Sequence, residues 1–473
     1  MPPMRSSRRE FLAGVAGAAA LAPAALRGRA EQAQGVAPWD RAAEILRRIV
    51  PPRFPSRHFE ITRFGAVGDG KADSSAAIRR AIATCHAAGG GSVVVPAGRF
   101  LTGGIRLASG VNLHLEAKAT LAFSGDARKY LPLVLTRFEG TELMNYAPFI
   151  YALEAENIAI TGTGTLDGQA HAGAWWNWRG EGPAAQSQQA AARNRLLEMG
   201  ARGVPVKERV FGAGHWLRPN FIQPYRSRNV LIEGVTIVNS PMWEINPVLC
   251  QNVTVRNVSV SSHGPNNDGC DPESCRDVLI DGCTFDTGDD CIALKSGRNN
   301  DGRRLNTPIE NVIIRNCTMK DGHGGVVIGS EISGGARNIF AEQCRMDSPR
   351  LDRVLRIKTN SVRGGIVEGV YMRGVTVGQV AEAVVTIDFF YEERVAGPFP
   401  PIVRDIEVRT VTSTKSKYGL LLKGYAKDPI TDVRLIDCRF DGVAEGDVIE
   451  AVRDLVRTNV VVNGTAITDR ISR

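Results

Sequence analysis

The chain has 473 residues, of which 43% are hydrophobic, 6% aromatic and 23% charged, and it carries a net charge of +8. This apolar content excludes a wholly disordered chain, and the 50 glycines follow no every-third-residue pattern, which excludes collagen. Many glycines, few aromatics and short Val/Ile runs indicate an all-β protein rich in turns. The scattered Lys and Arg do not indicate a nucleic-acid partner, whereas an acidic polysaccharide fits the positive charge.

An export signal is predicted at residues 1–30. Arg8 and Arg9 precede an apolar, alanine-rich run at residues 11–26, and small residues follow near Ala30. The run is shorter than the roughly 20 residues that span a bilayer, so a removable signal is favoured over a retained anchor. The adjacent arginines resemble the twin-arginine type, which exports folded proteins. We therefore expect a periplasmic or extracellular protein that is not held in a membrane after signal removal, with residues 31–58 as a linker.

A helix is predicted at residues 73–85, at the start of a domain that spans residues 59–473. Asp73 is the expected N-cap, and the apolar residues recur on one face of the helix. These residues are Ala77, Ile78, Ala81, Ile82 and Cys85. We expect this helix to cover the first coil of the fold.

Residues 169–220 are predicted to be an insertion. They carry Trp175, Trp176 and Trp178 within a polar, alanine-rich stretch that lacks the strand pattern. The tryptophans can stack on sugars or pack locally, and local packing is favoured.

A short phrase recurs from about residue 229 onward. Its first position is a polar residue or Gly, its second is Val or Ile, its third is variable and its fourth is apolar. It ends on an apolar residue or Cys six positions after its start. The copies span residues 229–235, 252–258, 277–283, 311–317, 338–344, 369–375, 405–411 and 432–438. Periods of roughly 20 to 50 residues are typical of solenoids, and no helix pattern separates consecutive copies. The sequence therefore predicts a right-handed parallel β-helix.

The repeat also accounts for several of the nine cysteines. Cys283, Cys317, Cys344 and Cys438 fill the slot that valine fills in other copies, so we expect them to be buried core residues. Cys270 and Cys275 are expected in a loop, where a disulfide between them is an alternative to free thiols. No zinc-type spacing is present.

Polar residues that are unusual for core strands cluster in four consecutive copies. They are Asn266-Asn267-Asp268, Gly288-Asp289-Asp290, Gly322-His323-Gly324 and Arg356-Ile357-Lys358. Asp289 and His323 each lie six residues after the end of their copy. Equal offsets place the two side chains on one face, about 4.8 Å apart along the stack. We therefore expect one stripe of acids, imidazole and cations.

Three crowded carboxylates cannot all ionise at their ordinary pKa, because like charges raise the pKa of at least one. A protonated acid beside ionised carboxylates is what glycoside hydrolysis requires. Calcium binding is an alternative for clustered aspartates, but His323, Arg356 and Lys358 would repel the ion and favour an anionic substrate. Exposed aspartates with no shared site are the remaining interpretation.

These four motifs, in this order, resemble the polygalacturonase family of glycoside hydrolases. The resemblance runs from Phe64-Gly65-Ala66-Val67-Gly68-Asp69-Gly70 to about residue 440. The stretch from Asp277 to Ser330, with Cys291-Ile292-Ala293-Leu294-Lys295-Ser296-Gly297, is most similar to the bacterial branch, which includes exo-acting enzymes. The family implies a right-handed β-helix and hydrolysis of the α-1,4 bonds of polygalacturonate with inversion.

The resemblance also implies roles for single residues. Asp289 would be the general acid, Asp268 and Asp290 would hold and activate water, and His323 would tune the acid. Arg356, Lys358 and Asn266 would bind the substrate, the two cations through a galacturonate carboxylate. The family usually has Thr where Asn267 stands, and Tyr418 is the candidate for a late-coil tyrosine. No organic cofactor or catalytic metal is implied.

Other functions stay open at this point. They are a calcium-dependent pectate lyase, a non-catalytic polysaccharide-binding β-helix, and a rhamnogalacturonan- or xylogalacturonan-cleaving relative. Arg356 and Lys358 favour galacturonate beside the cleaved bond. Exo action would require a wall at one end of the groove, for which residues 169–220 and 298–304 are candidates.

Overall fold

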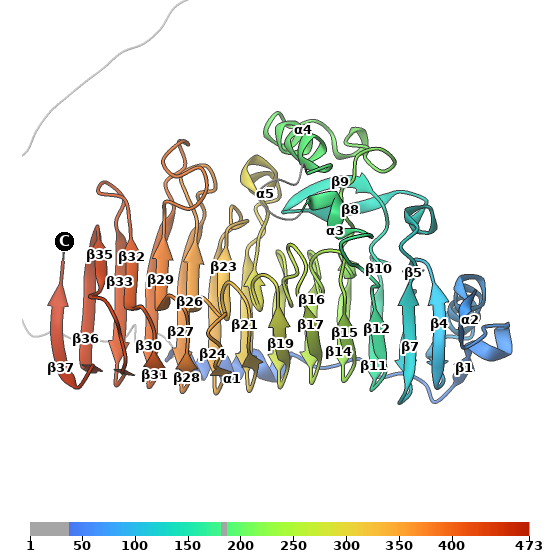
Figure 1. The fold of residues 1–473 in the computed structure, drawn as a ribbon, viewed down its shortest axis with the longest axis horizontal. Helices are drawn as coiled ribbons and strands as arrows, with labels where there is room; N and C mark the ends of the chain where they lie inside the picture. The colour runs from blue at the N-terminus through green and yellow to red at the C-terminus, as the bar shows by residue number, and fades with distance from the viewer. Residues whose placement is uncertain (1–36, 181–186, 473) are drawn as a thin grey trace, which may run out of the picture.

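The computed structural model describes residues 37–180 and 187–472. Over these residues the chain forms a right-handed parallel β-helix, whose coils run from the N-terminal helix α2 at one end to the C-terminal strand β37 at the other (Figure 1). The predicted fold class is confirmed. The predicted export signal lies outside the described residues. In the described part of the chain, no helix has the length and apolar character to cross a bilayer.

The coils stack as three parallel ladders. In the first ladder, equivalent repeat positions pair directly, so that Val253 lies between Val230 and Val278. Its strands are β1 (His58–Glu60), β3 (Gly91–Val95), β6 (Val111–Leu115), β11 (Glu156–Gly162), β14 (Arg228–Glu233), β16 (Gln251–Arg256), β18 (Arg276–Asp281), β21 (Ile309–Arg315), β24 (Ala336–Glu342), β27 (Ile366–Arg373), β30 (Ile402–Arg409), β33 (Ile430–Ile436) and β36 (Val452–Val462).

The second ladder follows the first after a short turn in each coil. Its strands are β2 (Asp69–Asp73), β4 (Gly98–Thr102), β7 (Ala119–Phe123), β12 (Thr165–Asp167), β15 (Thr236–Val238), β17 (Ser259–Ser262), β19 (Thr284–Thr287), β22 (Thr318–Met319), β25 (Arg345–Met346), β28 (Thr376–Gln379), β31 (Thr412–Lys415) and β34 (Arg439–Phe440). β37 (Thr465–Ile471) pairs antiparallel with β36 and ends the stack.

The third ladder completes each coil and carries the polar motifs. Its strands are β5 (Ile105–Arg106), β10 (Ile150–Leu153), β13 (Ile222–Tyr225), β20 (Ile292–Leu294), β23 (Val326–Gly329), β26 (Arg353–Lys358), β29 (Ala383–Asp388), β32 (Tyr418–Lys423) and β35 (Val448–Glu450). Single bridges join Ile222 to Ile245, Ile245 to Cys270 and Cys270 to Ile292, which connects β13 to β20.

The residue type at the first position of each repeat follows from the backbone conformation there. These residues adopt positive φ angles between 53° and 66°, where Asn, Asp and Gly cost least. The position also forms a side-chain ladder: the amide of Asn229 donates to Asn157 at 2.9 Å, and that of Asn252 donates to Asn229 at 2.8 Å. The members are Asn229, Asn252, Asp277, Asn311, Asn338, Gly369, Asp405 and Asp432.

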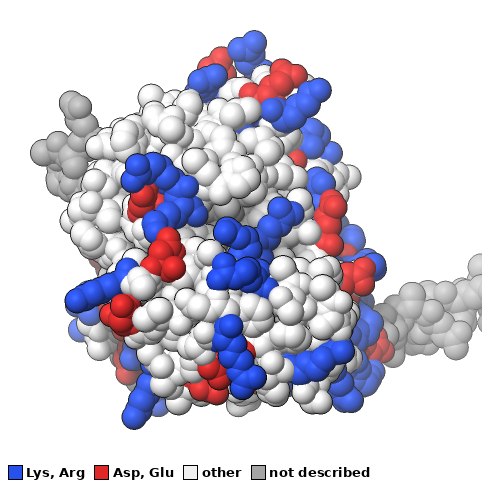
Figure 2. All heavy atoms as spheres, turned by 90° about the vertical axis from the view of Figure 1, so that its right-hand side faces the viewer, with Lys and Arg blue, Asp and Glu red and all other residues white. Residues whose placement is uncertain are grey.

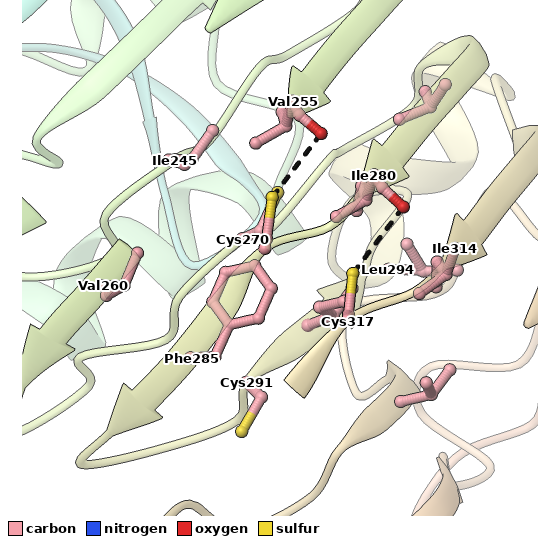
Figure 3. Close-up of a cluster of buried hydrophobic side chains, with 14 of the residues drawn as sticks. Ile245, Val255, Val260, Cys270, Ile280, Phe285, Cys291, Leu294, Ile314 and Cys317 are labelled. Atoms are coloured by element: carbon pink, nitrogen blue, oxygen red, sulfur yellow. Dashed lines mark hydrogen bonds between the residues drawn. The ribbon is translucent and has the colours of Figure 1, made fainter. Parts of the chain in front are cut away.

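The cysteines lie in the apolar interior, as expected for the repeat slot. Cys283, Cys317, Cys344 and Cys438 are buried and free. Figure 3 shows Cys317 beside Ile280 and Ile314, with its thiol directed at the Ile280 carbonyl.

Cys270 and Cys275 lie between β17 and β18, outside the named strands, as expected, but the alternative of a disulfide between them is wrong. Both residues are buried in the core and free, because the chain there bridges two coils. Figure 3 places Cys270 beside Phe285.

Helix α2 (Ser75–Ala87) covers the first coil and buries the predicted apolar face. Its N-cap is Ser74 and not Asp73 as predicted. Asp73 still serves the helix start, because its carboxylate accepts the Ser75 backbone N–H at 2.9 Å. The 3-10 helix η1 (Ile61–Phe64) precedes it, and η2 (Ala127–Tyr130) follows β7.

Residues 31–58, expected as a linker, contain helix α1 (Pro38–Arg48). It packs on the outside of the first ladder, in the middle of the stack, with Ile45 against the cluster of Leu279, Ile313, Phe340 and Tyr371. Pro38 at the first turn and an amphipathic face explain the helix, which has no counterpart in the repeat.

The interruption of the repeat lies between β12 and β13. It holds the helices α3 (Trp176–Arg179) and α4 (Ala190–Ala201) and the 3-10 helix η3 (Val206–Glu208). Trp175 is buried against Tyr130, Phe149 and Trp178, which confirms that local packing prevails for this residue.

An antiparallel hairpin, β8 (Val134–Phe138) and β9 (Thr141–Asn145), was not anticipated. It rises with α4 and α5 (Asn299–Leu305) above the coils (Figure 1). Viewed from the end that carries α2, Lys and Arg groups alternate with Asp and Glu groups over a largely uncharged face (Figure 2).

Candidate active site

The predicted polar stripe lies on the third ladder. Its members come from the starts of strands or from within them: Asp268 before the Cys270 bridge, Asp289 and Asp290 before β20, His323 before β23, and Arg356 and Lys358 in β26. The His323 N–H donates to the Asp289 carbonyl at 3.0 Å, and the Gly269 N–H donates to that of Asp290 at 3.0 Å. This backbone ladder brings the side chains of four successive coils together.

Three carboxylates meet at the centre of the stripe. One oxygen from each of Asp268, Asp289 and Asp290 lies within 4.8 Å of the others. Asp289 accepts a hydrogen bond from His323 Nδ1 at 2.9 Å and one from the Asp290 N–H at 3.0 Å. Asp268 and Asp290 are buried, and Asp289 is partly buried. The arrangement forces like charges together in a place where water screens them poorly.

Crowding and burial shift the pKa values of these carboxyl groups in different directions. Burial and then the charge of Asp289 raise the pKa of Asp268 well above its ordinary value. Burial acts in the same direction on Asp289, but the hydrogen bond from His323 and the charge of Lys358 lower its pKa to about 2. The hydrogen bond to Asp289 in turn raises the pKa of His323. The two pKa values are therefore shifted in opposite directions, and because the groups are close together they titrate as one unit.

Two cations hold the third carboxylate. Lys358 Nζ lies 2.6 Å from Asp290 Oδ2, and Arg356 Nη1 lies 3.4 Å from Asp290 Oδ1. Lys295 Nζ lies 3.5 Å from Asp268 Oδ2. A calcium ion needs six to eight oxygen ligands, whereas ammonium groups already surround these carboxylates. The residues present do not fit a calcium site, and they favour an anion.

The two asparagines of the first motif have different surroundings. Asn266 lines the pocket and accepts a hydrogen bond from the buried Arg218 at 2.7 Å. Asn267 is fully buried, and its side-chain oxygen accepts from Ser262 at 2.7 Å and from the Gly264 N–H at 2.8 Å. Asn267 therefore fixes the turn that presents Asp268, without facing the pocket itself.

The stripe, apart from the fully buried Asp290, lines a pocket of about 480 Å³. The solenoid supplies its floor, and segments outside the repeat supply one side. Those outside residues are Glu139 from the β8–β9 turn, Arg179 from α3, Ser187 and Gln189 before α4, and Ala190, Arg193 and Asn194 from α4.

Several pocket residues were missed by the sequence analysis, among them Lys295, Trp243 and Tyr391. Lys295 belongs to the Cys291–Gly297 stretch that carried the resemblance, so a signal for it was present. Trp243 and Tyr391 lie in loops that have no fixed offset from the repeat. Tyr391 lies under both cations, with its ring centroid 5.5 Å from Arg356 Cζ and 5.3 Å from Lys358 Nζ.

Tyr418, predicted as the late-coil tyrosine, does not line the pocket. Its hydroxyl donates to Glu445 at 2.8 Å on the surface. The loop after β29 carries Tyr391 to the pocket instead, and that path does not follow the repeat spacing.

Comparison with known proteins identifies the family. Residues 213–458 match the model described as Glycosyl hydrolases family 28. The chain belongs to this family. It is therefore a glycoside hydrolase. Residues 58–177 match a second model, described as Rhamnogalacturonase A/epimerase, pectate lyase-like.

Family 28 relatives cover most of the chain. An exopolygalacturonase from Thermotoga maritima is 44% identical in sequence, with a TM-score of 0.89 over 92% of this chain and 98% of that chain. A polygalacturonase from Erwinia carotovora is 25% identical, with a TM-score of 0.65 over 86% and 98%. A probable polygalacturonase from Vitis vinifera is 28% identical over 389 residues, which are 78% of this chain and 71% of the relative.

Proposed function

We propose that the protein hydrolyses α-1,4 bonds between galacturonates in polygalacturonate or pectin. The observation that carries this proposal is the placement of Arg356 and Lys358 in the pocket that Asp268 and Asp289 line, where both cations also contact the buried Asp290. Acids alone suit any glycoside, but two cations at the floor select a sugar that carries a carboxylate. The 44% identical exopolygalacturonase supports the same substrate class.

In this mechanism Asp289 protonates the leaving oxygen, and Asp268 and Asp290 hold and activate the attacking water. His323 donates to Asp289 and orients it. For this role the proton of the pair must lie on Asp289 in the reactive complex, whereas in the free protein the pKa of Asp268 is raised and that of Asp289 is lowered. Arg356 and Lys358 bind the carboxylate of the galacturonate beside the cleaved bond, and Asn266 contributes a polar contact from the pocket wall.

Inversion is part of the proposal because of the family resemblance and not because of the carboxylate spacing. The oxygens within 4.8 Å of one another are closer than the roughly 6.5–9.5 Å between carboxyl groups that is usual for inverting enzymes. They also lie slightly closer than the roughly 5–5.5 Å usual for retaining ones. Proton NMR of the first product formed discriminates: a β-anomer from the α-linked substrate supports inversion, and an α-anomer contradicts it.

Exo action is the favoured mode because segments outside the solenoid line one side of the pocket. Arg193 of α4 binds Glu139 at 2.6 Å, and Arg298 binds the same carboxylate at 3.1 Å. These ion pairs tie α4 and the hairpin to the coil that carries Asp289. Such a wall would admit a chain end and exclude the middle of a polymer.

The decisive experiment is incubation with galacturonate oligomers of defined length. Early release of a single short product from every oligomer supports exo action, and a mixture of lengths contradicts it. Release of reducing ends without ultraviolet absorbance, in the presence of a chelator, separates hydrolysis from a calcium-dependent lyase. Binding with no product at any pH would instead support a non-catalytic β-helix.

A rhamnogalacturonan substrate is the second candidate, favoured by the description of the model that matches residues 58–177. Cleavage of rhamnogalacturonan with no cleavage of polygalacturonate would establish it.

Export by the predicted twin-arginine signal is also a proposal. It is tested by replacing Arg8 and Arg9 with lysine and measuring the amount of protein outside the cytoplasm.

A further inference from the structure

Lys295 is a buried cation that no step of the proposed mechanism uses. It follows β20, only 3% of its surface is exposed, and its ammonium group lines the pocket. The Nζ atom lies 3.5 Å from Asp268 Oδ2, 3.2 Å from Glu331 Oε2 and 4.4 Å from the centroid of the Trp243 ring. The Glu331 carboxylate and the Trp243 ring both contact this ammonium group.

The three carboxylates of the stripe differ in their partners. Asp290 has Lys358 and Arg356, and Asp289 has His323. Among the described residues, Lys295 forms the sole ion pair of Asp268.

Acidic groups crowd Asp268 from several coils. The charged and titratable groups that act on it or share its pocket are Glu139, Arg179, Arg193, Glu244, Asp271, Asp289, Asp290, Lys295, Arg298, His323, Glu331, Arg356, Lys358, Tyr391 and Glu392. Both oxygens of Glu244 and of Asp271 are buried and without a hydrogen-bond partner within the described part of the chain. Burial raises the pKa of each of these two carboxyls and so favours their neutral forms, although the charge of Asp271 also acts on Lys295.

Glu331 competes for the lysine but is itself shared. Its Oε1 lies 3.3 Å from Arg298 Nη1, so two cations divide one carboxylate. The positive charge of Lys295 therefore still acts on Asp268, across a buried contact where water screens little.

We propose that Lys295 is a positioning residue, whose charge favours the ionised form of Asp268 and thereby favours the arrangement with the shared proton of the pair on Asp289. This inference rests on the proposed hydrolysis. It gives that mechanism a group that favours the arrangement with Asp268 as base and Asp289 as acid. A substrate carboxylate bound near Lys358 would leave Lys295 as the cation dedicated to Asp268.

The test is the pH profile of kcat/KM for Lys295→Met, Lys295→Arg and Glu331→Gln on polygalacturonate. Loss of the cation raises the pKa of Asp268, so in Lys295→Met the acid limb moves to higher pH. A shift of about one unit corresponds to about a tenfold loss of rate on that limb. We expect kcat to fall more than KM rises. Lys295→Arg should restore the limb in part, and Glu331→Gln should move it to lower pH, because it leaves Lys295 to Asp268 alone.

Lys417→Met is the matched control, since Lys417 pairs with Glu445 on the surface and does not line the pocket. Circular dichroism and thermal melting show whether each variant is folded. If Lys295→Met does not fold, the other two variants test the inference. The acid limb should then lie at somewhat higher pH in Lys295→Arg and at lower pH in Glu331→Gln than in the wild type. An unchanged acid limb in folded variants, or a rise in KM alone, overturns the inference. A wild-type protein that cleaves no galacturonate polymer overturns the proposed function instead.

Discussion

In the interior of the coils, one slot accepts Val235, Val258, Cys283 or Cys317, whereas on the third ladder each coil presents a different charged group. Both regions share the same register and the same stacking distance. The interior needs only apolar volume, so its members are interchangeable. The pocket needs a proton donor, a base and cations at fixed levels, so exchange of any one changes the chemistry. A repeat thus specifies the scaffold, and its exceptions specify the function.

The largest expected effect comes from Asp289→Asn, which keeps the size of the side chain and removes the acid. We expect kcat to fall about 10²- to 10⁴-fold, the usual contribution of a general acid. Reducing-end release on polygalacturonate measures it. The melting temperature should stay close to that of the wild type, because Asn can still accept the His323 hydrogen bond. Full activity in this variant would remove Asp289 from its proposed role.

The pair of Asp289 and His323 can be followed by titration. The hydrogen bond to Asp289 raises the pKa of His323, so the native state favours the imidazolium. The stabilising charge contact is therefore present below the unfolded-state pKa of histidine, near 6.5. It is lost as the pH rises through the higher native pKa. NMR titration should give a raised pKa in the wild type and a value nearer the ordinary one in Asp289→Asn. Equal values in both proteins would contradict the contact.

The two tyrosines offer a matched comparison. Tyr391→Phe removes the hydroxyl of a pocket ring that packs against Arg356 and Lys358, and Tyr418→Phe removes one on the surface. We expect KM to rise several-fold for Tyr391→Phe, in keeping with about 0.5–1.5 kcal/mol for one hydrogen bond. Tyr418→Phe should match the wild type in kcat and KM. The reverse result would restore Tyr418 as the late-coil tyrosine.

The smallest effect on activity is expected in the interior. Cys317→Val places in one coil the residue that other coils already have, so we expect less than about 1.5 kcal/mol of destabilisation and unchanged kcat. Cys317→Ser, which buries a hydroxyl, should cost about 1–3 kcal/mol unless the hydroxyl finds a partner. Thermal melting ranks the two variants. A large loss of activity in folded Cys317→Val would show that the interior and the pocket are coupled.

The fold could be predicted because stacking repeats every coil. The residue that starts each copy, such as Asn229, requires a positive φ, and the residue that ends it, such as Cys283, fills the interior. Such local requirements recur in the sequence at nearly constant spacing. The meeting of Asp289 with His323 followed from the same spacing, since equal offsets in neighbouring coils bring two side chains together.

The side of the pocket that lies outside the repeat, and the pKa shifts of the pocket carboxyls, depended on the tertiary structure. Tyr391, Trp243 and Arg193 reach the pocket through loops or an added helix, whose paths follow no repeat. The helix α1 was equally invisible as a partner of the coils, because its docking site is formed by strands hundreds of residues away.

The sequence by itself determined the coil, its register and the list of charged groups that face one way, since each of these depends on near neighbours in a periodic stack. Only the tertiary structure decided which carboxylate pairs with which cation and what closes the pocket. Burial and Coulomb interactions depend on distances in space, and chain segments outside the repeat set those distances.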